Sequence, residues 1–186
     1  TIGMLGGIFS YAVRQGMLAD SPVRMVKRWK DRRMDRYLSQ QELERLGHEL
    51  NEAEARNENP KAIAIIRLLA LTGARKSEVT TLTWSEIDFD NGILRLRDSK
   101  TGQKTIPVGT SALTILAAQP RTNDSDYVFP ADKLGREDAK RSHFQGIDAI
   151  WHRVRSKAGL SDVRLHDLRH TAASIAVANG ASLPMI

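Results

Sequence analysis

The feature that most constrains the fold of this chain is an almost wholly apolar run from Lys61 to Leu71, which reads Ala-Ile-Ala-Ile-Ile-Arg-Leu-Leu-Ala-Leu after the lysine. A helix that is apolar on nearly all sides has to be covered on all sides, so we expect this segment at the centre of a helical core. Gly73 follows the run and predicts the end of the helix, because glycine adopts the left-handed conformation that closes helices.

Further helices are predicted on both sides of this run. Ser39 and Glu42 form a Ser-x-x-Glu pattern, which caps the start of a helix. Apolar residues at helical spacing predict a short helix at 111–118, a longer one at 142–157 and a last complete one at 165–180. An additional helix is expected at 3–17, near the start of the chain.

Three short segments with alternating apolar and polar residues predict a small antiparallel sheet. The strands are expected at 87–89, 93–97 and 104–108, with an Asp-Asn-Gly turn at 90–92 and a second turn at 98–103. Together with the helices, this sheet predicts an α+β fold that is mainly α-helical, with three antiparallel strands.

The composition excludes several classes of protein. The chain has no cysteine, so it can form neither a disulfide nor a thiolate site for zinc or iron–sulfur clusters. No apolar run approaches the ~18 residues that would span a bilayer. We therefore expect a soluble protein that does not interact with a membrane.

Positive charge is concentrated near the start of the chain. The net charge is +6, and residues 1–40 contribute +5 of it, with eight Lys and Arg against three Asp and Glu. A basic segment of this kind suits contacts to a nucleic-acid backbone, although a solvated charged linker is equally consistent with it. The candidate DNA-binding residues are Arg24, Lys27, Arg28, Lys30, Arg32, Arg33 and Arg36.

Polar side chains from three segments could form a phosphate site. In the last complete helix, His166, Arg169 and His170 fall at i, i+3 and i+4 and share one face, which puts a proton-transfer group beside a fixed cation. Arg75 follows the apolar helix and Lys100 lies in the second turn of the sheet. Each of these residues alone is a weak signal, because most surface cations are simply solvated.

The order and context of these residues resemble the catalytic domain of the tyrosine recombinase (phage integrase) family. The sequence Thr-Gly-Ala-Arg-Lys-Ser-Glu at 72–78 is similar to the box that carries the first catalytic arginine of the family. Ser-Lys-Thr-Gly at 99–102 is similar to its lysine turn, and His-Asp-Leu-Arg-His-Thr at 166–171 to its His-x-x-Arg box. The resemblance implies cleavage and rejoining of DNA through a 3′-phosphotyrosyl intermediate, without a cofactor or metal.

The resemblance also implies a role for each candidate residue. Arg75 and Arg169 would clamp the non-bridging oxygens of the phosphate, where charge builds up in the transition state. Lys100 would protonate the departing 5′-oxygen, and His166 would act as a base or proton shuttle near the nucleophile. Two residues are expected to support the site: Glu78 and His170.

The domain organisation follows from the same resemblance. Residues 1–18 are expected to be the C-terminal helix of an N-terminal core-binding (SAM-like) domain that is otherwise absent, and residues 19–36 a basic interdomain linker. Residues 37–186 would form the catalytic domain, incomplete at its C-terminus.

The nucleophilic tyrosine of the family follows the His-x-x-Arg box. The three tyrosines of this chain, Tyr11, Tyr37 and Tyr127, all precede that box. We therefore expect no nucleophile within the 186 residues, and we expect this chain to bind DNA without cleaving it.

The expected partner is a double-stranded DNA recombination site in the bacterial cytoplasm, with association with the nucleoid during recombination. A tetramer on DNA when the protein is full length and DNA-bending accessory proteins are implied by the resemblance only.

Two alternatives are open. His166 and His170 could hold zinc, as helical histidine pairs do. The chain could also be a non-catalytic DNA-binding protein that uses the basic linker and the outward cations of the helix at 142–157.

Overall fold

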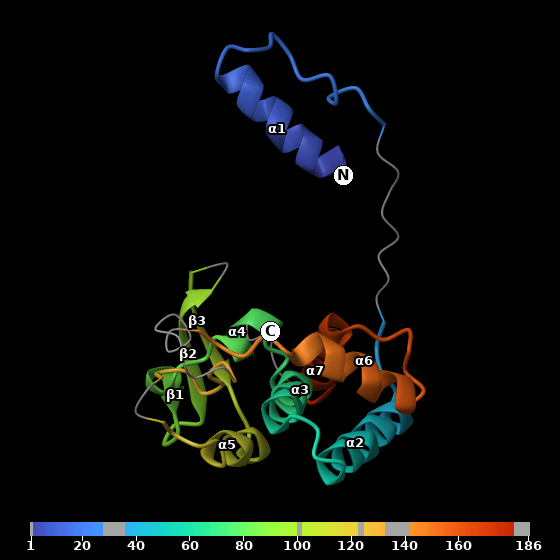
Figure 1. The fold of residues 1–186 in the computed structure, drawn as a ribbon, viewed down its shortest axis with the longest axis vertical. Coiled ribbons are helices and arrows are strands. Elements are labelled where there is room, and N and C mark those ends of the chain that lie inside the picture. The colour runs from blue at the N-terminus through green and yellow to red at the C-terminus, as the bar shows by residue number, and fades with distance from the viewer. Residues whose placement is uncertain (1, 28–35, 100–101, 123–124, 133–141, 181–186) are drawn as a thin grey trace. The chain divides into compact units, whose positions relative to one another are not determined.

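The computed structural model describes residues 2–27, 36–99, 102–122, 125–132 and 142–180 (Figure 1). The chain divides into two compact units, Thr1–Met34 and Asp35–Ile186.

The first unit contains helix α1 (Ile2–Arg14) and the segment that follows it. The helix ends earlier than the predicted 3–17, because Gly16 has a φ of +70° and the backbone N–H of Met17 donates to the carbonyl of Ala12. This pattern, with a left-handed glycine after the last turn, closes a helix by satisfying its final carbonyls. None of the α1 residues is buried in the described part of the chain.

The second unit is organised around α3 (Pro60–Thr72), as the apolar run predicted. Helices α2 (Gln40–Ala55), α5 (Thr110–Ala117), α6 (Ile147–Lys157) and α7 (Leu165–Ala178) all pack against it (Figure 1). Burial on several sides explains why α3 has almost no polar face. Its buried residues are Ala62, Ile63, Ala64, Ile65, Ile66, Leu68 and Leu69.

The predicted start of α2 is confirmed in atomic detail. The Ser39 hydroxyl accepts a hydrogen bond from the backbone N–H of Glu42 at 3.3 Å, and the Glu42 carboxylate accepts one from the backbone N–H of Ser39 at 2.9 Å. This reciprocal cap satisfies two N–H groups that have no partner within the helix. Helix α3 ends at Gly73, as the sequence predicted.

The predicted three-stranded antiparallel sheet is also confirmed. It consists of β1 (Ile87–Asp88), β2 (Ile93–Ser99) and β3 (Gly102–Pro107), in the spatial order β1-β2-β3 (Figure 1). Leu94 pairs with Ile106, and Leu96 pairs with Lys104. Leu94, Leu96 and Ile106 are buried, so this face of the sheet contributes to the same core as α3.

Two short elements were not predicted. Helix α4 (Lys76–Thr80) follows α3, and a single 3₁₀ turn, η1 (Trp84–Glu86), leads into β1. Elements of one turn carry too few residues to show a period in the sequence. Among the described residues, no helix combines the length and apolar character needed to cross a membrane.

The predicted helix at 142–157 is shorter than expected, because it begins only at Ile147. Residues 142–144 run instead alongside residues 129–131. The backbone N–H of Phe144 donates to the carbonyl of Phe129 at 2.8 Å, and that of Ala131 donates to Ser142 at 3.0 Å. Both phenylalanines are buried, so pairing with a distant segment replaces the first turn of the predicted helix.

Candidate functional site

Helix α7 is fixed in rotation by polar groups on its buried face. Asp167 is fully buried and accepts hydrogen bonds from the backbone N–H of Arg164 at 2.7 Å and from its guanidinium at 2.7 and 3.1 Å. Burial would raise the pKa of Asp167, but the hydrogen bonds and charge of Arg164 outweigh it and lower the pKa. The buried hydroxyl of Thr171 donates to the carbonyl of Asp167 and accepts from the backbone N–H of Leu38 at 3.0 Å. His166, Arg169 and His170 therefore face away from the core.

Arg169 reaches from α7 to the end of α3. Its Nη1 donates to the carbonyl of Gly73 at 2.6 Å. Gly73 has a φ of +63°, and a Cβ atom added there would lie 3.2 Å from the Cβ of Ala172. The two helices thus approach closely at a glycine, and this approach brings the segment that contains Arg75 next to α7.

The substitution Gly73→Ala is expected to destabilise the fold by about 1–2 kcal/mol for the left-handed backbone alone, and by more because of the contact with Ala172. Gly159→Ala is the matched control, because Gly159 has a φ of +71° and no atom within 4 Å of an added Cβ. Urea unfolding of both variants measures the difference. Equal destabilisation would mean that the α3–α7 approach is not tight at Gly73.

Arg75 lies immediately before α4 and is held by Glu78 from the same turn. The Glu78 carboxylate accepts a hydrogen bond from the backbone N–H of Arg75 at 2.8 Å and another from its Nη1 at 2.7 Å. Burial would raise the pKa of Glu78, but hydrogen bonds from Arg75 and from Lys104 lower it instead. The carboxylate is therefore ionised at neutral pH, and its position supports the predicted role in orienting Arg75.

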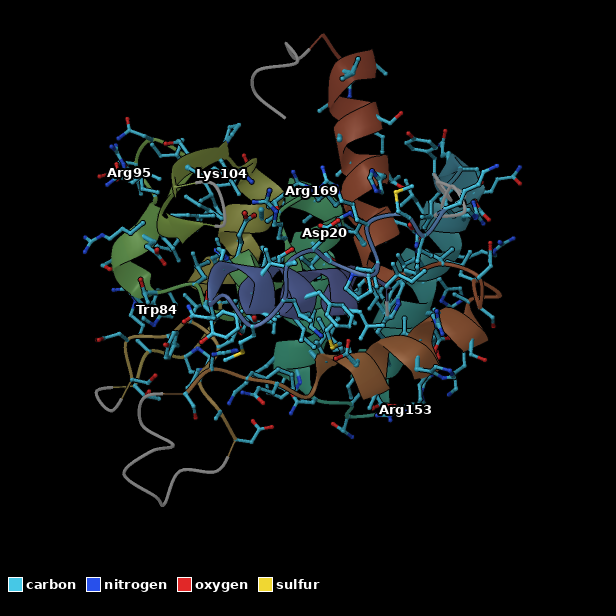
Figure 2. All side chains as sticks on the ribbon, turned by 90° about the horizontal axis from the view of Figure 1, so that it is seen from above. Asp20, Trp84, Arg95, Lys104, Arg153 and Arg169 are labelled. Atoms are coloured by element: carbon cyan, nitrogen blue, oxygen red, sulfur yellow. The ribbon has the colours of Figure 1, made fainter. Side chains whose placement is uncertain are left out.

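Lys104 also lies at this place, although the sequence did not predict it. Its Nζ lies 3.2 Å from the Glu78 carboxylate, and it lines a concavity of about 170 Å³ together with Arg169. Both residues are labelled in Figure 2. The alternation of Lys104, Thr105 and Ile106 could have placed the lysine on the inner face of the sheet. Lys100, which was predicted as the general acid, lies outside the described residues.

His166 and His170 lie edge to face, with their ring centroids 4.7 Å apart. Desolvation lowers the pKa of His166 from its ordinary value of 6.5, and the nearby positive charges of His170 and Arg169 lower it further. The imidazole is therefore mostly neutral at pH 7 and able to accept a proton. In the described ranges, no cluster of three or more His, Asp or Glu side chains could hold a metal ion, so the zinc alternative finds no third protein ligand there.

Removing the imidazole of His170 is expected to raise the pKa of His166 toward 6.5 in the variant His170→Gln, because the electrostatic interaction with His170 is lost. Folding lowers the pKa of His166, so the folded protein binds fewer protons than the unfolded chain and loses stability as the pH falls below about 6.5. The variant should lose less stability over the same pH range, because its pKa shift is smaller. Titration of the imidazole protons by NMR measures the pKa, and urea unfolding above and below pH 6.5 measures the loss of stability. His152→Gln on α6 is the control, and an unchanged pKa of His166 in His170→Gln would contradict the prediction.

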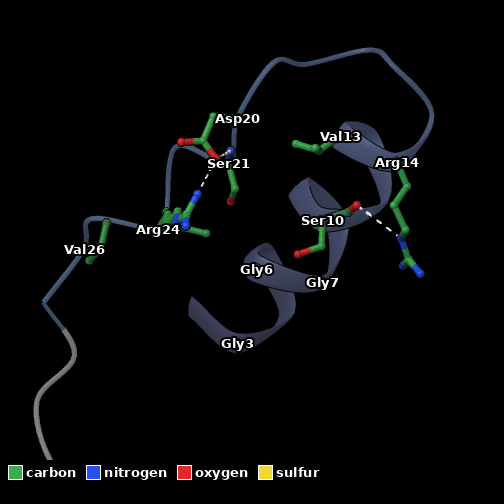
Figure 3. A pocket seen from close by; sticks show the side chains of 11 residues that line it. Gly3, Gly6, Gly7, Ser10, Val13, Arg14, Asp20, Ser21, Arg24 and Val26 are labelled. Carbon is green, nitrogen blue, oxygen red and sulfur yellow. Dashed lines mark hydrogen bonds and ion pairs between the residues drawn. The ribbon is translucent and has the colours of Figure 1, made fainter.

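Six of the seven predicted DNA-binding residues fall into three groups. Arg24 forms an ion pair with Asp20 at 3.5 Å on the surface of the first unit, where Figure 3 shows the Asp20 carboxylate also accepting from the backbone of Ser21. Lys27 is exposed. The third group lies outside the described residues: Arg28, Lys30, Arg32 and Arg33.

The Arg36 guanidinium, which was expected to contact a DNA phosphate, binds groups of the protein in this structure. Four of the five N–H groups of its guanidinium are used, two by Glu42 at 2.5 and 3.0 Å, one by Asp162 at 2.8 Å and one by the carbonyl of Tyr37. The hydrogen bond from Arg36 is the main reason that the pKa of Glu42 falls to about 2. Arg36 thus fastens the start of the second unit to the loop before α7.

The outward cations of α6 are partly engaged as well. Arg153 binds Glu58 through two hydrogen bonds of 2.5 and 3.0 Å, and Arg155 donates to the carbonyl of Val163 at 2.8 Å. His152 and Lys157 are exposed. This helix therefore offers fewer open cations than the sequence suggested.

Comparison with known proteins identifies relatives along the whole chain. Residues 36–186 match the phage integrase family. Prophage integrase IntF of Escherichia coli K12 is 31% identical over 123 residues, which cover 63% of this chain and 25% of IntF. Tyrosine recombinase XerD of Pasteurella multocida is 28% identical over 96% of this chain and 62% of XerD. The chain thus spans less than two thirds of the length of these relatives.

Solved structures show the same fold. The XerA recombinase superposes with a TM-score of 0.60 at 26% identity, covering 80% of this chain and 53% of XerA. A lambda integrase dimer bound to a COC′ core site has a TM-score of 0.67 at 19% identity, covering 97% of this chain and 66% of the integrase chain. With the motif order, the fold and a family match over residues 36–186, this chain belongs to the phage integrase family.

Proposed function

We propose that the protein containing this chain is a site-specific DNA recombinase that cleaves and rejoins DNA through a 3′-phosphotyrosyl intermediate. The observation that carries the proposal is the junction at Gly73, whose carbonyl binds Arg169 and which lies two positions before Arg75. Two arginines from distant segments are thereby attached to one short junction, and guanidinium is the group best suited to bind two phosphate oxygens at once.

In the proposed reaction, a tyrosine hydroxyl attacks the scissile phosphorus, so that a bond from tyrosine to phosphorus forms and the bond to the 5′-oxygen breaks. Arg75 and Arg169 stabilise the charge on the non-bridging oxygens. His166, kept neutral by its lowered pKa, accepts the tyrosine proton, and Lys100 donates a proton to the 5′-oxygen. Rejoining is the reverse of these steps, so bond energy is conserved and no cofactor is needed.

The proposed organisation assigns residues 1–18 to a core-binding domain, residues 19–36 to a basic linker that follows the DNA backbone, and residues 37–186 to the catalytic domain. The three tyrosines of the chain all precede the His-x-x-Arg box, and none of them is proposed as the nucleophile. The coding sequence downstream of Ile186 tests this directly. Covalent attachment of DNA to the 186-residue chain itself would overturn it.

The proposed partner is a double-stranded DNA recombination site, bound by several copies of the protein. The related lambda integrase is a dimer on its core site, and the Tn1549 integrase is in complex with circular intermediate DNA. Similarity of fold supports the same class of partner here. A tetramer on DNA, accessory DNA-bending proteins and a place in the bacterial cytoplasm are further parts of the proposal.

The test is covalent capture of DNA. The complete gene product is incubated with genomic DNA of its source, and protein–DNA adducts that resist detergent are collected and sequenced. We expect adducts at defined sites, each opposite a free 5′-hydroxyl that polynucleotide kinase can label. Binding without adducts would favour the non-catalytic alternative, in which the exposed Lys157 of α6 should also be required for binding.

A further inference from the structure

Lys104 occupies an unusual position for a lysine. Residues two apart in a strand point to the same side, so Lys104 shares its side of β3 with the buried Ile106. In the sheet register it pairs with Leu96, which is also buried. Only 23% of its side chain is exposed. An inward lysine of this kind needs an anionic partner, because a charge removed from water is costly without one.

The partner of Lys104 is Glu78. The Glu78 side chain is 4% exposed, and its oxygens lie 3.2 and 3.5 Å from the Lys104 ammonium. The same carboxylate accepts two hydrogen bonds from Arg75. One buried anion is thus shared by a lysine from the sheet and an arginine from the turn before α4.

Because Arg75 and Lys104 share the Glu78 carboxylate, the net charge next to a bound phosphate depends on Lys104. Without Lys104, the Glu78 carboxylate would cancel the charge of Arg75, and the pair would be neutral to an incoming anion. With Lys104, two cations share one carboxylate, and one net positive charge remains. The Lys104 side chain also borders the concavity that Arg169 lines, so this charge is presented beside the second arginine (Figure 2).

We propose that Lys104 is a positioning residue of the phosphate site, which neutralises Glu78 so that Arg75 keeps its orientation without losing its charge to the carboxylate. The proposal rests on the proposed function, because it assumes that Arg75 and Arg169 bind a DNA phosphate. It assigns to Lys104 a role that differs from proton donation by Lys100.

The test compares Lys104→Met, Lys104→Arg and the double variant Lys104→Met/Glu78→Gln. Lys104→Met should slow covalent adduct formation by the complete gene product by about tenfold or more, because one charge next to the phosphate is lost. Lys104→Arg should restore the rate. The double variant should be faster than Lys104→Met alone, since removing the carboxylate removes the need for its counter-charge.

A matched control is Lys76→Met. Lys76 is adjacent to Arg75 in sequence, but its ammonium binds the exposed Asp148 on α6. This variant should react like the wild type. If Lys104→Met and Lys76→Met behave alike, or if the double variant is slower than Lys104→Met, the proposal is wrong.

Two measurements on the 186-residue chain separate this proposal from the proposed function. Carbon-13 NMR of the Glu78 carboxyl should show a higher pKa in Lys104→Met than in the wild type. Binding of inorganic phosphate, followed by phosphorus-31 NMR, should weaken in the same variant. If the wild type forms no DNA adduct but both effects appear, the proposed function fails and the role of Lys104 stands. Absence of Lys104-dependent phosphate binding would overturn that role, whatever the result with DNA.

Discussion

Replacing Arg169 by alanine is expected to slow covalent adduct formation by about 10²–10³-fold, because a preorganised charged donor to the phosphate is lost when charge builds up on its oxygens. Binding of the same DNA should weaken much less, since many other contacts to the phosphate backbone remain. Single-turnover assays on a captured site, together with fluorescence anisotropy, measure the two quantities separately. Arg75→Ala should behave in the same way.

The matched control for this prediction is Arg153→Ala. Arg153 binds Glu58, which lies just before the start of α3, whereas Arg169 binds Gly73, which lies just after the end of α3. The 13 residues of α3 separate these two points by about 20 Å, and Figure 2 also shows the two arginines apart. Equal losses of binding and cleavage in Arg169→Ala would indicate that the arginine serves binding alone.

Lys100→Ala is expected to reduce cleavage by about 10²–10⁴-fold, the range for a lost general acid. The reason is that an alkoxide is a poor leaving group unless it is protonated as it departs. Replacing the scissile 5′-oxygen of the DNA by sulfur should restore most of the rate of this variant, because a thiolate leaves without needing a proton. The measurement is adduct formation from the two matched DNA substrates.

The comparison with Lys104→Met makes this prediction sharper. If Lys100 donates the proton and Lys104 only balances Glu78, sulfur should rescue Lys100→Ala but not Lys104→Met. Rescue of neither variant would assign to Lys100 a role in binding or positioning. Rescue of both would assign proton donation to Lys104 as well.

The sequence predicted those parts of the fold whose signals are local. The apolar run that became α3, the Ser39 cap of α2 and the Asp-Asn-Gly turn between β1 and β2 each depend on residues close together in the chain. The order of the three motifs was also sufficient to identify the family, which the match over residues 36–186 confirmed.

The features that the sequence did not predict depend on distant partners. The sequence predicts the start of α6 too early because Phe144 pairs with Phe129, and it does not show that Glu42 and Asp162 bind Arg36. Lys104 was overlooked because its partner, Glu78, lies on a different element. The sequence does not show whether a cationic side chain is already paired with a carboxylate, because that pairing depends on the tertiary fold.

The hydrogen bond between Leu38 and Thr171 gives the second unit a mechanical property. It joins the backbone just before α2 directly to the helix that carries Arg169. A displacement of the chain ahead of Leu38 would therefore strain a direct hydrogen bond to α7. Tension on the chain at this point is thus expected to act on the helix that carries Arg169 as well as on the start of α2.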